Sequence, residues 1–268
     1  MEIAGSKALV TGASRGVGAA IARALMDQGA EVWGTSRDPG QVEWPEGLRP
    51  LQLDLGAASR IEQAWNEQRL SDIGFDIVVN NAGSGAFGRF EEMEFEVWES
   101  QIQTLLLGVM KLTRLALPDL LERGGYLVNV GSLAAEFPIP FMSAYNAAKA
   151  GLSAFTESLV IESLGSDFKI VNLELGDLKT DFNRSVFKKT SKNEIGVCAD
   201  TVWRQIERRI YVSPTPDTAA NQLLRCIQKE KIGRIRAGSR FQTIFAPLFS
   251  RLAPRNLIRT INISYYGK

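Results

Sequence analysis

Short apolar runs rich in β-branched residues alternate along the chain with longer segments in which apolar residues recur at helical spacing. Runs of the first kind are typical of strands buried on both faces, and segments of the second kind are typical of helices. The pattern predicts strands within residues 7–11, 31–36, 48–55, 75–83, 125–132, 168–176 and 233–238. It predicts helices within residues 17–29, 59–70, 95–122, 143–164 and 215–230.

Strands that alternate with helices form βαβ units, in which the strands are parallel and the crossovers are right-handed. We therefore expect an α/β fold, a doubly wound, Rossmann-like three-layer sandwich with a mainly parallel sheet of about seven strands. Ser59 is the expected N-cap of the second helix, and Thr215 or Asp217 that of the last. No break in composition indicates a domain boundary, so residues 1–238 are expected to form one domain, followed by a C-terminal extension at 239–268.

The composition is that of a globular protein, with 45% hydrophobic and 23% charged residues in a chain of 268. The formal net charge is +1, so no strong field favours nucleic acid, and no nucleic-acid partner is expected. Two cysteines are too few for a structural zinc site, and no metal is expected. The chain has no signal-peptide pattern and no spanning apolar stretch, which predicts a cytoplasmic protein.

A glycine-rich turn lies between the first expected strand and the first expected helix. Gly12, Gly16 and Gly18 have the spacing G-x-x-x-G-x-G. Glycines in such a turn let the backbone and a cofactor approach closely, and the helix N-terminus offers free N–H groups to a pyrophosphate. An ordinary strand-to-helix turn is the less favoured interpretation. The turn therefore predicts a dinucleotide site.

The end of the second strand indicates which dinucleotide is bound. A site for NAD(H) usually places an acidic residue there to accept from the ribose 2′-OH. Thr35 and Ser36 occupy those positions, and Arg37 follows. Arg37 and Arg15, from the glycine turn, suit a 2′-phosphate through charge-assisted hydrogen bonds. We predict NADP(H); Asp38 keeps NAD(H) open as the less favoured alternative.

Four motifs follow one another in the chain: TGASRGVG at 11–18, NNAG at 80–83, Ser132, and YNAAK at 145–149. With these motifs in this order, the chain resembles the short-chain dehydrogenase/reductase family over about residues 7–238. The resemblance implies one domain for cofactor binding and catalysis, a variable substrate lid at about 181–214, and a homodimer or homotetramer. It implies catalytic roles for Ser132, Tyr145 and Lys149.

The resemblance also implies which residues contact the cofactor. The glycine turn would hold the phosphates, an aspartate after the third strand the adenine, and a threonine after the sixth strand the nicotinamide carboxamide. The family usually has Pro-Gly before that threonine, whereas this chain has Leu175-Gly176. The implied cofactor-binding residues are Gly12, Ser14, Arg15, Gly16, Val17, Gly18, Arg37, Asp54, Leu55, Asn81, Ala82, Gly83, Tyr145, Lys149 and Thr180.

The chain contains no histidine, the usual proton carrier near neutral pH, and Tyr145 is the candidate for this role. The ordinary pKa of tyrosine, about 10, is too high for a base at neutral pH. Lys149 lies one helical turn after Tyr145, and we expect its ammonium to lower the pKa of Tyr145. Ser132 could bond the substrate oxygen as charge develops there. The predicted reaction interconverts a carbonyl and a secondary alcohol, with Tyr145 as general acid and base.

The chain departs from the family pattern on the helix that precedes the tyrosine. Many members have an asparagine there, in an N-x-x-G arrangement, that orders a water beside the lysine. Here Leu105 stands three residues before Gly108, with Gln103 and Thr104 as neighbouring polar candidates. This departure keeps two alternatives open. One is a catalytically weak NADP(H)-binding sensor or structural partner, and the other is a lyase or epimerase with the same Ser-Tyr-Lys set.

The segments expected around the substrate are apolar and suit a lipophilic carbonyl or alcohol. They are the loop at 133–142 and the expected lid. The C-terminal extension mixes apolar and basic residues, as in a basic amphipathic helix. It could pack over the pocket, pack against a second subunit, or lie on an anionic membrane surface. By the resemblance, the apolar helices with Leu105 to Leu121 and Leu152 to Leu164 build the subunit interface.

Overall fold

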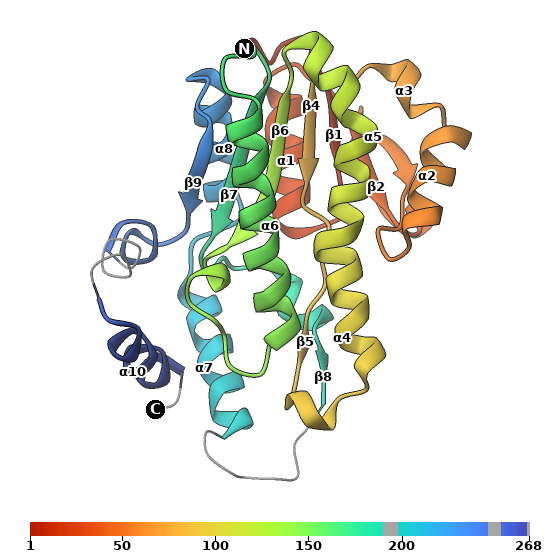
Figure 1. Cartoon of the computed structure of the whole chain (residues 1–268). Coiled ribbons are helices and arrows are strands. Elements are labelled where there is room, and N and C mark those ends of the chain that lie inside the picture. Colours follow the sequence, from red (N-terminus) through yellow and green to blue (C-terminus); the bar gives the residue numbers. More distant parts are fainter. Residues whose placement is uncertain (190–197, 246–252, 267–268) are drawn as a thin grey trace.

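A computed structural model describes residues 1–189, 198–245 and 253–266. Seven strands form one sheet: β1 (Lys7–Val10), β2 (Glu31–Ser36), β3 (Arg49–Gln52), β4 (Ile77–Asn80), β6 (Tyr126–Ser132), β7 (Lys169–Leu175) and β9 (Gly233–Ala237). The helices are α1 (Gly16–Asp27), α2 (Ala58–Glu67), α3 (Leu70–Ile73), α4 (Phe95–Ile102), α5 (Gly108–Arg123), α6 (Ser143–Glu162), α7 (Ala199–Val212), α8 (Asp217–Gln228) and α10 (Arg255–Tyr266). Figure 1 shows their arrangement.

The sheet has the order β3-β2-β1-β4-β6-β7-β9, and every neighbouring pair is parallel. The predicted doubly wound α/β fold with a seven-stranded parallel sheet is therefore confirmed. The chain runs outward from β1 through β2 to β3, and then returns to β4 on the other side of β1. Such a switch point opens a crevice at the carboxyl ends of the strands, where open α/β sheets bind their ligands.

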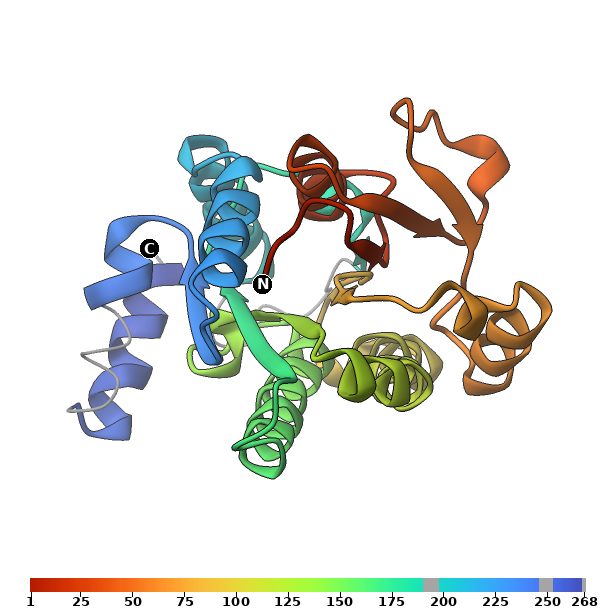
Figure 2. The same ribbon diagram turned by 90° about the horizontal axis from the view of Figure 1, so that it is seen from above.

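Helices cover both faces of the sheet, as Figure 2 shows along the strand direction. Successive residues of a strand point to opposite faces. In β1, Ala8 and Val10 belong to the apolar core under α1 and α8, whereas Leu9 belongs to the core under α2, α5 and α6. The strands are apolar at consecutive positions because each face of the sheet is buried.

A buried polar network fixes α6, which carries Tyr145, against the centre of the sheet. Asn80 at the end of β4 donates from Nδ2 to Oγ1 of Thr113 on α5 at 3.1 Å and to Oδ1 of Asn129 on β6 at 2.8 Å. Asn129 donates in turn to Oγ1 of Thr156 on α6 at 2.9 Å. Buried polar groups that are paired in this way specify one arrangement of the elements around them.

Several local predictions were wrong. The N-cap of α2 is Ala57, without a side-chain cap, and Ser59 lies inside the helix. The N-cap of α8 is Pro216, and the flanking Thr215 and Asp217 side chains bond each other at 3.1 Å instead of capping the helix. The expected helix at 95–122 contains a π-helical segment at Gln103–Leu107, between α4 and α5.

The expected lid contains structure that the sequence pattern did not predict. It includes a 3-10 turn at Asp181–Ser185, strand β8 (Phe187–Lys188) and helix α7. β8 pairs with β5 (Ala86–Phe87) in a two-stranded parallel sheet, visible below the main sheet in Figure 1. Residues 190–197 of this lid lie outside the described residues. Within the described part, no helix is long and apolar enough to cross a membrane.

Candidate active site

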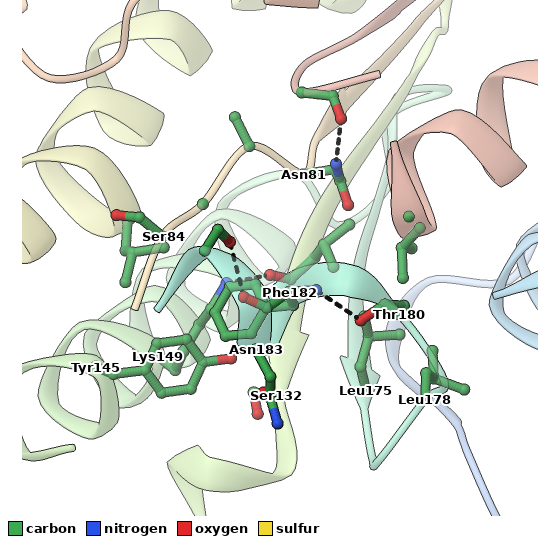
Figure 3. Close-up of a pocket in the computed structure, with 18 of the residues that line it drawn as sticks. Asn81, Ser84, Ser132, Tyr145, Lys149, Leu175, Leu178, Thr180, Phe182 and Asn183 are labelled. Carbon is green, nitrogen blue, oxygen red and sulfur yellow. Dashed lines mark hydrogen bonds between the residues drawn. The ribbon is translucent and has the colours of Figure 1, made fainter. Parts of the chain in front are cut away.

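A cavity of about 1320 Å³ lies at the carboxyl ends of the central strands. It runs from the glycine turn after β1 along the ends of β2, β4 and β6, and reaches the lid and the C-terminal segment. All the residues expected to carry catalysis or cofactor binding line this cavity, with the exception of Gly18. Figure 3 shows Ser132, Tyr145 and Lys149 grouped in one part of it.

The glycine turn leaves a helix end free at the wall of the cavity. Arg15 is the N-cap of α1, in an extended conformation and with no side-chain cap. The first amides of α1 are thus available to an anion, and Gly16 and Val17 line the cavity at this point. Gly16 has a φ of 58°, a left-handed conformation that glycine adopts without strain.

Gly18 packs the turn from behind instead of lining the cavity. A Cβ added there would overlap the Gly12 carbonyl oxygen and the Asn81 side-chain nitrogen. Asn81 Nδ2 donates to the Thr11 and Gly12 carbonyls, at 2.9 and 3.2 Å. The Asn81 side chain therefore ties the turn after β4 to the glycine turn after β1, and Gly18 leaves room for it.

The end of the cavity near β2 and β3 presents groups that fit the adenosine side of a dinucleotide. Arg15, Arg37 and Asp38 line it, and the buried Ser36 hydroxyl there has no hydrogen-bond partner in the described part of the chain. A buried hydroxyl of this kind is satisfied when a ligand oxygen reaches it. Asp54 also lines the cavity, and its carboxylate accepts from Arg60 at 3.1 Å and from the Gly56 amide at 2.9 Å.

The three expected catalytic side chains come from β6 and α6. Ser132 is the last residue of β6, and its Oγ accepts from the Ala134 amide at 3.1 Å. Lys149 is buried, and its Nζ donates to the Val130 carbonyl at 2.7 Å. That Nζ lies 5.9 Å from the centre of the Tyr145 ring. Ser132, Tyr145 and Lys149 can therefore act at one point of the cavity.

Burial dominates the titration of this site. It raises the pKa of Tyr145, and the nearby Asp177 carboxylate raises it further, while a hydrogen bond from Ser132 acts in the opposite direction. Burial also lowers the pKa of Lys149 to about 8. The predicted lowering of the Tyr145 pKa by Lys149 is therefore wrong for this structure. Burial shifts both groups towards their neutral forms: the phenol keeps its proton, whereas Lys149, with a pKa of about 8, is still charged near pH 7.

Leu105, at the position of the family asparagine, is buried at the cavity wall in the π-helical segment. Its side chain packs so closely on Gly83 that a Cβ there would lie 2.9 Å from Leu105 Cδ2. Thr104 also lines the cavity, whereas Gln103 does not. Of the two neighbouring polar candidates, only Thr104 can therefore place a hydroxyl at the cavity.

The apolar half of the cavity is built from the lid and the C-terminal segment. Trp203 and Ile206 of α7 pack in one cluster with Tyr145, Phe182 and Tyr266. The bonds that hold helix α10 over this cluster include one from Arg209 of α7 to the Tyr265 carbonyl, at 2.7 Å, and one from Asn262 to the Pro138 carbonyl, at 3.2 Å. Of the three arrangements left open for the C-terminal extension, packing over the pocket is the one this structure has.

Asp177 is a cavity residue that the sequence analysis missed. It follows β7, three residues before Thr180, and is half-buried. Its Oδ2 accepts from Gln242 Nε2 at 2.7 Å and from the Tyr265 hydroxyl at 3.3 Å, while its amide donates to Gln242 Oε1 at 3.1 Å. An acidic residue at the carboxyl end of a buried strand, beside a cofactor motif, was a signal that could have identified it.

Comparison with known proteins agrees with these motifs. A family model described as "short chain dehydrogenase" matches residues 6–191, and this range contains the glycine turn, Ser132, Tyr145 and Lys149. The chain belongs to the short-chain dehydrogenase family. The match ends inside the lid, so the C-terminal segment that closes the cavity lies beyond the part that the family model describes.

Relatives within the short-chain dehydrogenase family include a 3-ketodihydrosphingosine reductase from Bacteroides thetaiotaomicron. It is 34% identical over 190 residues, which span 69% of this chain and 70% of that protein. A short-chain dehydrogenase from Streptomyces avermitilis superposes with a TM-score of 0.82 at 25% identity and covers 98% of both chains.

Two further solved structures of similar fold contain a nicotinamide dinucleotide. An alcohol dehydrogenase from Thermococcus sibiricus, complexed with 5-hydroxy-NADP, has a TM-score of 0.68 at 26% identity and covers 88% of this chain and 97% of its own. A 3-ketoacyl-(acyl-carrier-protein) reductase from Brucella melitensis, complexed with NADH, has a TM-score of 0.70 at 25% identity and covers 87% and 97%.

Proposed function

We propose that this short-chain dehydrogenase is an NADP(H)-dependent oxidoreductase that interconverts a carbonyl and a secondary alcohol on a lipophilic substrate. The observation that carries the proposal is the continuous cavity, which joins the glycine turn to Tyr145 and then to an apolar pocket. A bound nicotinamide supplies or accepts the hydride in such a reaction. The protein contributes binding, orientation and proton transfer.

Tyr145 moves the proton in this proposal. Its hydroxyl donates a proton to the substrate oxygen during reduction, and the phenolate accepts one during oxidation. The Ser132 hydroxyl donates to the same oxygen and stabilises the negative charge that develops there. Lys149, fixed on the Val130 carbonyl, places a positive charge beside the phenol. Because burial raises the pKa of Tyr145, the free site holds the protonated phenol, which is the form that donates the proton during reduction.

The preference for NADP(H) rests on the groups at the adenosine end of the cavity. Arg15 and Arg37 line that end together with the unpartnered Ser36 hydroxyl. Two guanidinium groups and a hydroxyl suit the charge and the geometry of a 2′-phosphate. The solved relatives with bound cofactor include one with an NADP derivative and one with NADH, so the arginines are the basis for this preference.

The apolar half of the cavity and the relatives support a lipophilic substrate. The 3-ketodihydrosphingosine reductase and the 3-ketoacyl-(acyl-carrier-protein) reductase are both named for the reduction of a keto compound. In this chain, Phe182, Trp203, Ile206 and Tyr266 provide an apolar surface that would hold such a chain beside Tyr145. A large, mainly apolar pocket with a few polar groups is the common form of such a site.

The proposal includes a homodimer or homotetramer in the cytoplasm. Leu107, Met110 and Leu121 form an exposed apolar stripe on and beside α5, and Ile161 is exposed on α6. Apolar side chains grouped in this way suit a subunit interface, which light scattering would detect. Peripheral contact with an anionic membrane is part of the proposal because Phe241, Ile244, Leu257 and Ile263 are exposed on the C-terminal segment, near the exposed Arg240 and Arg259.

NADPH oxidation with a panel of long-chain ketones tests the proposal, with the Y145F variant beside the wild type. We expect Y145F to bind NADPH with unchanged affinity and to lose turnover by at least about a hundredfold, because the acid-base group is gone. Near-normal turnover in Y145F would contradict the role of Tyr145. Tight NADPH binding by the wild type without turnover of any ketone would favour the alternative of a weakly active sensor, which the apolar Leu105 supports.

A further inference from the structure

The Asp177 carboxylate lies in the substrate half of the cavity, close to the proposed acid-base group. It raises the pKa of Tyr145, Tyr265 and Tyr266 through its negative charge. These tyrosines line the same cavity. A carboxylate that is partly buried among aromatic side chains is costly unless its charge is compensated. The structure therefore raises the question of what compensates it.

Within the described residues, Asp177 has no cationic partner in direct contact, although the positive charge of Arg209 acts on Tyr265 and Tyr266 in the opposite direction. No lysine or arginine there lies within ion-pair distance of Asp177. Two cationic side chains on neighbouring segments contact aromatic rings: the guanidinium of Arg209 lies 3.2 Å from the centre of the Tyr265 ring, and the ammonium of Lys179 lies 5.1 Å from that of Tyr211. Neither of these residues lines the cavity. The charge of Asp177 is thus available to a ligand.

The hydrogen bonds of Asp177 orient the carboxylate and leave one oxygen open. Both side-chain bonds, from Gln242 and Tyr265, are made to Oδ2. In the described part of the chain, Oδ1 accepts no hydrogen bond and is not among the buried atoms without a partner. Gly176 contributes to this arrangement, because a Cβ at that position would lie 3.0 Å or less from the Gln242 side chain. The C-terminal segment therefore holds Asp177 in place while Oδ1 remains accessible.

We propose that Asp177 is the binding site for a cationic group on the substrate, and that the preferred substrate is a lipophilic ketone with an ammonium group close to the carbonyl. This inference rests on the proposed function and names its substrate class. An ammonium group suits the site in two ways. It pairs with the free oxygen of Asp177, and the ring of Tyr145, which lines the same cavity, can provide a cation–π contact.

The proposal also explains how an acidic residue is tolerated beside the acid-base group. Without a cation, the charge of Asp177 opposes formation of the Tyr145 phenolate. A substrate ammonium bound at Asp177 cancels that field at the moment when Tyr145 gives up its proton to the substrate oxygen. Binding of the correct substrate would thus promote proton transfer, so the preference is expected in kcat as well as in KM.

The test compares two long-chain ketones that differ in one group: an α-amino ketone, assayed at a pH where the amine is protonated, and the α-hydroxy ketone of the same chain. We expect the wild type to favour the amino ketone in kcat/KM by at least about tenfold, the scale of a hydrogen bond to a charged group. D177N should lose this preference, so that the ratio of kcat/KM for the two ketones falls to about one. A wild type without the preference would overturn the proposal.

A matched variant distinguishes the effect of the Asp177 charge from its structural role in holding the C-terminal segment. Y265F removes one bond to Asp177 but keeps its charge, so it should keep the preference. If D177N and Y265F lower kcat/KM equally for both ketones, Asp177 only holds the C-terminal segment, and the proposal is wrong. D177N could instead weaken NADP⁺ binding and change kcat/KM equally for the two ketones. In that case the carboxylate contributes to cofactor binding, and the proposal is also wrong.

A binding measurement keeps this test distinct from that of the proposed function. Calorimetry can compare a long-chain alkylammonium ion with the alcohol of the same chain, each titrated into the wild-type protein with NADPH. Tighter binding of the ammonium, by about tenfold, is expected even if no ketone is turned over. Equal binding of the two would refute the assignment of Asp177, and absence of turnover with every ketone would refute the proposed function alone.

Discussion

Replacing Lys149 with methionine should make the protein more stable while it removes the activity. Lys149 is only 6% exposed, and burial lowers its pKa from 10.5 to about 8. At about 1.4 kcal/mol per pKa unit, the folded state bears a cost of about 3 kcal/mol for keeping this ammonium charged. Methionine has a similar length and no charge, so K149M removes this cost. It also loses the bond from Nζ to the Val130 carbonyl, which is worth about 1 kcal/mol.

The net expectation is that the free energy of unfolding rises by about 2 kcal/mol near pH 7, where Lys149 is charged in both the folded and the unfolded chain. The difference depends on pH. Above about pH 8 the folded protein releases the proton, whereas the unfolded chain keeps it up to its ordinary pKa of 10.5. The stability of the wild type should therefore increase relative to that of K149M between these values, and the gap should close near pH 10.

Urea unfolding of both proteins without cofactor, at several pH values between about 7 and 10, measures this gap. Changes at other titrating groups cancel, because they are common to the two proteins. K229M, which alters an exposed lysine, is the control and should show no such pH dependence. A wild type that is as stable as K149M near pH 7, or a gap that is constant across this range, would refute the argument that burial of the Lys149 charge is costly.

Three other substitutions test the remaining parts of the site. R37A should weaken NADPH binding by about tenfold or more and leave NADH binding unchanged, as a lost contact to the 2′-phosphate requires; equal losses in a fluorescence titration would contradict this. L105N should raise kcat if the missing asparagine limits proton transfer, at a cost of about 1–3 kcal/mol in urea unfolding for the buried amide; an unchanged kcat would indicate that protons leave by another route. G18A should weaken NADPH binding at least about tenfold, because the new Cβ displaces the Gly12 carbonyl and the Asn81 amide; normal affinity would show that the turn can relax.

Most of the fold could be predicted because the information is local. A strand buried on both faces is mostly apolar at consecutive positions, as the run from Ile77 to Val79 in β4 shows. Element ends were less predictable. Ser59 has the chemistry of an N-cap, yet the N-cap of α2 is Ala57, two residues earlier, and the helix buries Ile61 and Trp65 in the core.

The sequence by itself determined the sheet, the cofactor turn and the group of Ser132, Tyr145 and Lys149, because these features depend on residues that lie at strand ends or one helical turn apart. Tertiary structure alone decided that Asp177 meets Gln242 and Tyr265, which are 65 and 88 residues further along the chain. It also decided the titration of Tyr145. Burial and the field of a distant carboxylate are properties of the assembled site, and the spacing of a tyrosine and a lysine on one helix contains no information about either.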